Sequence, residues 1–374
     1  MSKVVQEVIR LDINLSQLKR NVKAISEMLK PGVKFMAVVK GNAYGHGLAP
    51  IAKALEQFGC HSLGVVRITE AMALRDSGIE IPIVMLAPIM PSQADEVVKY
   101  DLTIMLDNEC IAEEVDKCAK QHNKTVKVHI KVNTGLNRFG LEAAKVSDFI
   151  KKVKKNYDNL EIEGIYTHFR DPEFNKHFTD NQIEVFNEVL ENLEREGIRP
   201  ALAHAAATGG ILMYPEAHYD MIRCGILLYG EEYLKGKSVI PDEVLPITSL
   251  VSRIIKINEV ELGQAIGYGD RGIANRKSRI AVIAGGYGDG ISRGWKQILI
   301  NKQRVPIVNY AMDCIEADIT DVTGIVQEYD EAVFIGQQGN ECITWEDACY
   351  MLNTEVDEQL QRITGRVQRR YYFE

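Results

Sequence analysis

The chain has 374 residues, of which 46% are hydrophobic and 26% charged, the balance of an ordinary soluble globular protein. Its formal net charge is −8 and it contains no block of basic residues, which argues against nucleic acid or an anionic membrane as the partner. The amino terminus lacks the apolar core of a signal peptide, and the longest apolar runs are too short to span a bilayer. We therefore expect a cytoplasmic protein.

The seven cysteines contain no CxxC pair and none lies beside a histidine at metal-ligand spacing. We therefore expect no metal site, and free thiols rather than disulfides.

From residue 34 onward, short apolar runs alternate with amphipathic stretches. The segment 181–197, "NQIEVFNEVLENLEREG", spaces its apolar residues as a helix does and stops at a glycine. Strands alternating with helices imply βαβ units and a parallel sheet. The expected strands are residues 34–40, 62–66, 82–86, 102–106, 126–132, 161–169, 201–206 and 221–230. Eight strands favour a closed (β/α)₈ barrel over residues 1–245. An open doubly wound sheet is the alternative.

The pattern changes near residue 246. Strand-like runs separated by glycine and charged turns fill residues 246–374, and a helix is expected only near residues 344–353. This predicts a second, mostly antiparallel β domain.

One lysine stands out at the end of the first expected strand. In "KFMAVVKGNAYGHG", Lys40 follows an apolar run and precedes a glycine-rich turn. Reactive groups of a barrel collect at the carboxyl ends of its strands, and a poorly solvated lysine amine can condense with an aldehyde cofactor. A lysine that only extends into water is the other interpretation.

The stretch "AVVKGNAYGHG" (37–47) closely resembles the pyridoxal-phosphate signature of the alanine racemase family. That family has fold type III, with an amino-terminal barrel and a carboxyl-terminal β domain, and the resemblance extends over nearly the whole chain. It implies pyridoxal 5'-phosphate as the cofactor, Lys40 as its attachment point and Tyr44 as a further cofactor-binding residue.

Other barrel motifs carry the resemblance further. "KVNTGLNRFG" (131–140) resembles the family element whose arginine, here Arg138, contacts the phenolic oxygen of the cofactor and the substrate, while Lys131 matches a lysine that is carbamylated. "GIYTHF" (164–169) places His168 at the position of the family's second histidine near the cofactor.

The cofactor's phosphate and ring nitrogen are matched by two segments. "HAAATGG" (204–210) offers the Thr208 hydroxyl to the phosphate, although Ala207 replaces the family's asparagine. "YDMIRCGILLYG" (219–230) implies Arg223 against the pyridine nitrogen and the backbone N–H groups of Gly225 and Ile226 around the phosphate.

The β domain resembles the family in three elements. "AIGYGDRG" (265–272) makes Tyr268 the second catalytic base, and Tyr287, Met312 and Asp313 match substrate-binding positions at the entrance. Racemisation needs a base on each face of a planar carbanion, so Lys40 would serve one face and Tyr268 the other. In the family this tyrosine comes from the partner subunit, which implies a homodimer with composite sites.

The resemblance therefore predicts an enzyme that interconverts L- and D-alanine. Thr354 stands where the family has a tyrosine, and together with Ala207 it raises the alternative of a racemase that prefers serine or a larger amino acid. A decarboxylase of the same fold type and a non-catalytic pyridoxal-phosphate-binding protein are the remaining hypotheses.

Overall fold

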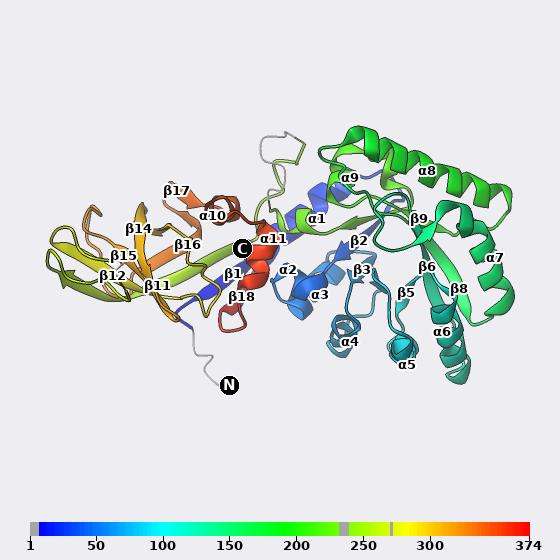
Figure 1. Cartoon of the computed structure of the whole chain (residues 1–374), viewed down its shortest axis with the longest axis horizontal. Coiled ribbons are helices and arrows are strands. Elements are labelled where there is room, and N and C mark those ends of the chain that lie inside the picture. The colour runs from blue at the N-terminus through cyan, green and yellow to red at the C-terminus, as the bar shows by residue number, and fades with distance from the viewer. Residues whose placement is uncertain (1–6, 232–238, 270–271) are drawn as a thin grey trace. The chain divides into compact units, whose positions relative to one another are not determined.

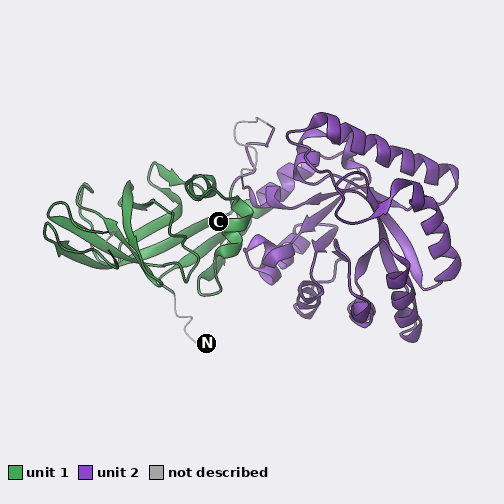
Figure 2. Ribbon diagram, viewed as in Figure 1, with its two compact units in different colours: residues 1–18, 246–374 green, residues 19–245 purple. Residues whose placement is uncertain are grey.

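The computed structural model describes residues 7–231, 239–269 and 272–374. The chain divides into two compact units, residues 19–245 and residues 1–18 together with 246–374 (Figure 2). The expectation that the barrel begins at residue 1 was wrong for the first 18 residues. They belong to the β unit because β1 (Arg10–Asn14) pairs antiparallel with β11 (Thr248–Val260) and parallel with β18 (Gln368–Tyr372).

The unit of residues 19–245 is built on eight parallel strands. In chain order these are β2 (Lys34–Val38), β3 (Ser62–Val65), β4 (Ile83–Met85), β5 (Thr103–Leu106), β6 (Val126–Asn133), β8 (Leu160–Tyr166), β9 (Leu202–His204) and β10 (Met221–Cys224). A two-residue strand, β7 (Leu141–Glu142), pairs with β6 beside this path.

The eight strands close on themselves. Their order is β10-β2-β3-β4-β5-β6-β8-β9, and backbone hydrogen bonds from Asp220 N to the Ala203 oxygen and from Arg223 N to the Ala206 oxygen join the two end strands. The predicted (β/α)₈ barrel is therefore confirmed, and the open doubly wound sheet was wrong. All eight expected strands are present because parallel strands buried on both faces read as continuous apolar runs.

Helices connect successive strands and follow one another around them (Figure 1). They are α1 (Leu15–Glu27), α2 (Lys40–Tyr44), α3 (Leu48–Gln57), α4 (Ile68–Asp76), α5 (Ala94–Lys99), α6 (Glu109–Gln121), α7 (Val146–Asn156), α8 (Lys176–Arg195) and α9 (Thr208–Met213). Short 3₁₀ turns are η1 (Pro91–Gln93), η2 (Ala143–Lys145), η3 (Pro215–His218) and η4 (Ile226–Tyr229). The longest helix, α8, coincides with the helical pattern expected at residues 181–197.

The second unit is a nine-stranded sheet with the order β17-β16-β13-β14-β15-β12-β11-β1-β18. Its remaining strands are β12 (Ser278–Ala284), β13 (Gln297–Ile300), β14 (Gln303–Tyr310), β15 (Cys314–Asp318), β16 (Glu331–Gln338) and β17 (Glu341–Ile343). β11 also pairs with β16, so the long strand joins both halves of the sheet. Its pairings are antiparallel apart from β1 with β18, which confirms the expected β domain.

Large aromatic side chains fill the core of this unit. Trp295, Phe334 and Trp345 are fully buried, with ring centroids 5.8 Å apart for Trp295 and Phe334 and 6.2 Å for the two tryptophans. The helix expected near residues 344–353 is α10 (Trp345–Leu352), and a second helix, α11 (Val356–Arg362), was missed. Thr344 caps α10 by accepting from Asp347 N, a typical helix start.

Candidate active site

The predicted barrel residues gather where the parallel strands end. Each comes from the last residues of a strand or from the segment directly after it, and such segments meet at one end of a barrel. The residues are Lys40 and Tyr44 after β2, Lys131 in β6, Arg138 beyond it, His168 after β8, Thr208 after β9, Arg223 in β10, and Gly225 and Ile226 after β10.

Lys40 departs from its expected setting in two respects. β2 ends at Val38, so Lys40 opens the turn α2 rather than closing the strand, and its side chain is exposed rather than buried. Its Nζ lies 5.7 Å from the centre of the Tyr44 ring. The amine is therefore accessible, at the strand end where the resemblance requires it.

The turn that follows Lys40 is left-handed. Gly41, Asn42, Ala43 and Tyr44 have φ values of 62°, 55°, 53° and 53°, which residues other than glycine seldom adopt. The Glu70 carboxylate supports the turn by accepting from Gly41 N at 2.6 Å. This reversed turn carries Tyr44 towards β10.

The hydroxyl of Tyr44 rests against the backbone at Gly225. A Cβ atom added at Gly225 would lie 2.6 Å from the Tyr44 oxygen, so only glycine allows this approach. The Tyr44 ring is supported by Tyr229, whose ring centre is 5.3 Å away. A phenol and the first backbone N–H groups after β10 thus converge, as a phosphate-binding cradle requires.

Arg223 lies inside the barrel with only 3% of its surface exposed. Its guanidinium donates to His204 Nδ1 at 2.9 Å, to His168 Nδ1 at 3.1 Å, and to the backbone oxygens of Thr167 and Ala205 at 2.9 and 2.8 Å. Burial lowers the pKa of Arg223 to about 10, so it remains charged at neutral pH. Four acceptors hold it in place, none of them a carboxylate.

These bonds fix the protons of a chain of histidines. A guanidinium donates but cannot accept, so His204 Nδ1 must accept from Arg223 Nη1 and the His204 ring is neutral, whereas Nη2 shares its two hydrogens among His168 Nδ1 and two backbone oxygens. The proton of His204 then sits on Nε2 and is donated to His129 Nδ1 at 2.9 Å. Burial, followed by the charge of Arg223, holds the pKa of His168 and of His204 well below the usual value, which agrees with neutral rings.

The chain ends at a carboxylate on the neighbouring strand. His129 Nε2 donates to Glu163 at 3.2 Å, and Lys127 donates to the same carboxylate at 2.6 Å. The hydrogen bond from His129 is the main reason why the pKa of Glu163 is lowered to about 2. Each hydrogen bond of this chain is therefore donated in the same direction, from Arg223 towards Glu163. Sequence reasoning missed His129, His204 and Glu163, although a histidine inside an apolar strand was a usable signal.

Lys131 is almost fully buried among cations. Its Nζ lies 4.3 Å from the centre of the Tyr166 ring, and the Arg223 guanidinium lies 5.3 Å from the same ring. Burial, then Arg223 and Arg138, hold the pKa of Lys131 well below its usual range. The positive charges of Arg223 and Arg138 disfavour a further cation at Lys131, and such surroundings favour an anion there.

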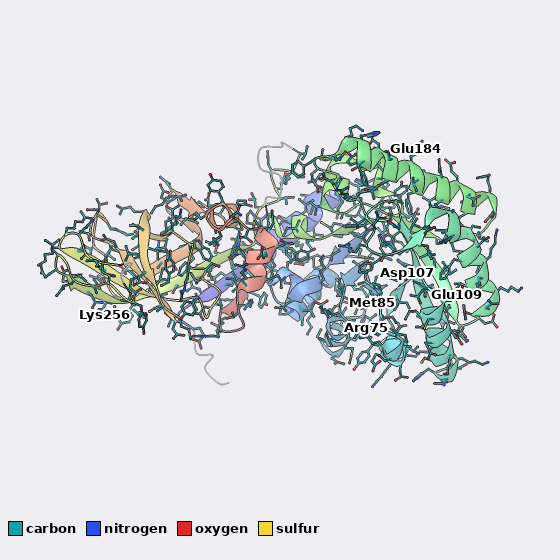
Figure 3. All side chains as sticks on the ribbon, in the orientation of Figure 1. Arg75, Met85, Asp107, Glu109, Glu184 and Lys256 are labelled. Atoms are coloured by element: carbon teal, nitrogen blue, oxygen red, sulfur yellow. The ribbon has the colours of Figure 1, made fainter. Side chains whose placement is uncertain are left out.

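Arg138 is exposed, in a loop that polar contacts hold in shape. Asn133 accepts from the backbone N of Gly135 at 3.1 Å and of Asn137 at 3.0 Å. Asp107, which directly follows β5 (Figure 3), accepts from Gly140 N at 3.0 Å. Asp107 was another residue that sequence reasoning missed.

The segment after β9, which the resemblance assigns to the cofactor's phosphate, lacks the family's asparagine. Ala207 stands at the N-cap of α9 and gives no side-chain cap, while Thr208 is buried at the first position of the helix. In the β unit, Thr354 donates to the Glu358 carboxylate at 2.5 Å, so its hydroxyl is engaged within its own segment.

The predicted residues of the β unit lie on neighbouring turns. Backbone bonds from Tyr287 N to the Ala311 oxygen and from Gly288 N to the Met312 oxygen bring Tyr287 and Met312 together. Asp313 accepts from Arg366 at 2.6 Å. Tyr268, whose side chain is 76% exposed, belongs to the motif 265–272, of which residues 270–271 lie outside the described residues.

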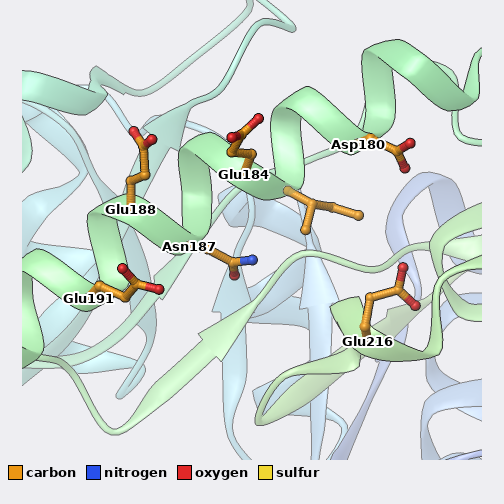
Figure 4. Close-up of a pocket in the computed structure, with 7 residues that line it drawn as sticks. Asp180, Glu184, Asn187, Glu188, Glu191 and Glu216 are labelled. Carbon is orange, nitrogen blue, oxygen red and sulfur yellow. The ribbon is translucent and has the colours of Figure 1, made fainter.

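A separate pocket lies between α8 and η3 (Figure 4). Its charged side chains are all acidic, and no group of histidine, cysteine or acidic residues in the described ranges could hold a metal ion. The lining residues are Asp180, Ile183, Glu184, Asn187, Glu188, Glu191 and Glu216.

Comparison with known proteins decides which family has this arrangement. The family described as "Alanine racemase, N-terminal domain" matches residues 13–233, and "Alanine racemase, C-terminal domain" matches residues 247–371. The chain belongs to the alanine racemase family. It is 49% identical over 370 residues to alanine racemase 2 of Clostridium acetobutylicum, covering 99% of this chain and 94% of that protein. It is 36% identical to the alanine racemase of Halothermothrix orenii, covering 96% of each chain.

Solved structures of alanine racemases have the same fold as this chain. The alanine racemase of Clostridium difficile 630 superposes with a TM-score of 0.92 at 29% identity, covering 99% of this chain and 97% of that one. The alanine racemase of Bacillus anthracis with bound L-Ala-P superposes with a TM-score of 0.90 at 29% identity, covering 99% and 96%. Membership of the alanine racemase family confirms the predicted amino-acid racemase and does not favour the alternatives. Within the described ranges, every helix is too short or too polar to cross a bilayer.

Proposed function

We propose that this chain is a pyridoxal 5'-phosphate-dependent alanine racemase that interconverts L- and D-alanine. The observation that supports it best is the buried Arg223 at the end of the barrel where Lys40, Tyr44 and Gly225 converge. An arginine donates to the ring nitrogen without protonating it, whereas a carboxylate would keep it protonated and make the ring a strong electron sink. Arg223 therefore favours simple removal and return of a proton over transamination.

The residues present fit this cofactor. Lys40 would carry it, the Tyr44 and Thr208 hydroxyls with the N–H groups of Gly225 and Ile226 would hold its phosphate, Arg138 would contact its phenolic oxygen, and Arg223 would contact its ring nitrogen. The cradle at Gly225, which a Cβ would fill, supports this assignment. When bound, the cofactor acidifies the Cα proton of the amino acid attached to it.

The protein then moves one proton on each face of Cα. Lys40 serves one face and Tyr268 the other, which is what inversion requires. His168 is neutral and hydrogen-bonded to Arg223, so it helps to orient the guanidinium without adding charge.

Lys131 would act as a carbamate. A neutral lysine amine reacts with carbon dioxide, forming an N–C bond and releasing a proton, and the positive charges of Arg223 and Arg138 would stabilise the resulting anion. Intact-mass measurement under carbon dioxide after chemical trapping, beside a Lys131→Ala variant, tests this. An equal mass for the two proteins after correction for the substitution would contradict it.

We further propose a homodimer in which Tyr268 of one subunit completes the site built around Lys40 of the other. Mixing Lys40→Ala with Tyr268→Phe protein, after dissociation and reassociation, then restores one intact site in each mixed dimer, or about a quarter of the wild-type activity. If both residues come from the same chain, the mixture stays inactive. Tyr287, Met312 and Asp313 would line the substrate's approach.

The decisive experiment follows Cα-proton exchange by NMR in deuterated buffer, with chiral analysis of the products. L-Alanine, L-serine and longer amino acids are compared on cofactor-loaded protein. Inversion of alanine ahead of the others is expected. Inversion mainly of serine would mean that Ala207 and Thr354 have changed the specificity, and no exchange in loaded protein would contradict catalysis. The expected cytoplasmic location is tested by fractionating cells of the source organism.

A further inference from the structure

The turn that carries Tyr268 is held through its backbone. The Tyr268 side chain is 76% exposed, and within the described residues the structure gives its hydroxyl no hydrogen bond. Its backbone oxygen, however, accepts from the side-chain amide of Asn309 at 3.0 Å. The position of this tyrosine within its unit is therefore set by whatever fixes the turn.

Asn309 uses every polar atom of its side chain here. It is only 4% exposed, and its Nδ2 donates both to the Ile266 oxygen at 2.6 Å and to the Tyr268 oxygen at 3.0 Å. Its Oδ1 accepts from Tyr310 N at 2.7 Å. Two carbonyl oxygens that face the same point need two N–H donors, and a primary amide supplies both without burying a charge.

The strand geometry brings Asn309 to this place. The register of β14 on β15 shifts between Ile307 and Asn309, so that Asn309 lies directly opposite Glu316. Such irregularities redirect side chains next to functional sites. Both side chains then lie under Gly267, where an added Cβ would be 2.5 Å from Asn309 Nδ2 and 3.0 Å from Glu316 Oε1. Gly267 has φ +66°, a conformation that favours glycine.

The segment before the tyrosine is fixed independently. Ile266 is 7% exposed and packs with Ala274 and Ile280, and its N donates to the Gly272 oxygen at 2.7 Å. The bond from Asn309 to the Tyr268 oxygen therefore transmits the rigidity of β14 to the residue that carries the phenol.

We propose that Asn309 is a positioning residue that fixes the 266–268 turn and so holds Tyr268 where it exchanges the Cα proton. This role rests on the proposed function, in which Tyr268 is the second base. The substrate enantiomer whose proton Lys40 removes can still exchange it for deuterium through Lys40 alone. Inversion of that enantiomer needs Tyr268 on the opposite face, so loss of positioning separates exchange from inversion.

The test compares exchange with inversion in cofactor-loaded wild type, Asn309→Ala and Asn309→Asp. The alanine variant removes both donors, and the aspartate variant turns a carboxylate oxygen towards two carbonyl oxygens. Asn301→Ala is the matched control, because Asn301 also bonds a backbone oxygen, that of Thr323 at 2.8 Å, from the turn before β14. Exchange and inversion are measured in the same sample from each enantiomer, so their ratio does not depend on the folded or loaded fraction.

For one enantiomer, both Asn309 variants should raise the ratio of exchange to inversion by about 10–100-fold, the effect of misplacing a catalytic group by about 1 Å. For the other enantiomer, whose proton Tyr268 removes, the rates of exchange and of inversion should fall together in both Asn309 variants. Asn301→Ala should keep the wild-type ratio of exchange to inversion. A wild-type ratio in both Asn309 variants, beside an active wild type, overturns the role of Asn309 alone. Wild-type protein that inverts neither enantiomer overturns the proposed function and this role with it.

Discussion

The carboxylate at the end of the histidine chain allows a quantitative prediction. Glu163 has its pKa lowered from 4.5 to about 2, and its side chain is 21% exposed. A pKa difference of about 2.5, at 1.36 kcal/mol for each pKa unit, corresponds to about 3 kcal/mol of stabilisation by the ionised group. Because its partner Lys127 is 47% exposed, solvent screening reduces this, and we expect Glu163→Gln to cost about 2 kcal/mol at pH 7.

The pH dependence distinguishes this cause from simple repacking. A carboxyl whose pKa is lowered on folding stabilises the fold above its unfolded pKa, here 4.5, and this stabilisation is lost as the pH falls towards 2. The difference between wild type and Glu163→Gln should therefore be largest near neutrality and narrow steadily below pH 5. Glu161→Gln is the control, because Glu161 is an exposed carboxylate two residues earlier on the same strand.

Urea denaturation of the cofactor-free protein at several pH values measures these differences. The barrel is followed by far-UV circular dichroism, because both tryptophans, Trp295 and Trp345, lie in the other unit and report on it by fluorescence. The reasoning is refuted if Glu163→Gln is as stable as Glu161→Gln at pH 7, or if its deficit does not shrink on acidification.

Three further predictions concern the cradle, the core of the β unit and a helix start. Gly225→Ala puts a methyl group 2.6 Å from the Tyr44 hydroxyl, so cofactor affinity measured by absorbance titration should fall at least about tenfold, while the cofactor-free protein loses about 1–3 kcal/mol of stability. Phe334→Ala empties a fully buried site against Trp295 and should cost about 3–5 kcal/mol, read from tryptophan fluorescence in urea; a loss under 1 kcal/mol would contradict the packing. Asn108→Ala removes the side-chain cap of α6 and should cost about 1 kcal/mol by circular dichroism, whereas Asn108→Ser should restore most of it.

The sequence predicted the barrel because its strands are local, buried and apolar. Six of the eight runs contain their strand in full, and β6 and β8 each extend one residue beyond theirs. The runs are recognisable because parallel strands need apolar residues on both faces. The amino-terminal strand β1 could not be assigned in this way. Its partners Leu250 and Arg369 are reached only through pairing across most of the chain, which a local pattern does not encode.

Sequence motifs predicted those residues of the candidate site that the motifs contain. The residues that belong to the site only through contacts in the folded protein were missed. Lys40, Tyr44 and Arg223 follow from the resemblance, but the left-handed turn at 41–44 does not, because Ala43 and Tyr44 have no intrinsic preference for it. The chain from Arg223 to Glu163 joins residues on four strands, so only the folded barrel reveals it. The same holds for Asn309, whose partners lie about forty residues earlier.

The pairing of β1 with β18 has a consequence for synthesis on the ribosome. Asp12 and Arg370 form an ion pair across 358 residues of sequence, so the first strand of the sheet meets its last partner only after residue 370 has been made. At about 5–20 residues per second, β1 waits roughly 20–70 seconds after it is made. All eight barrel strands leave the ribosome during that interval. The barrel can therefore form while β1 waits, and the β unit, whose first strand is made before the barrel, can be completed only after all eight barrel strands have been made.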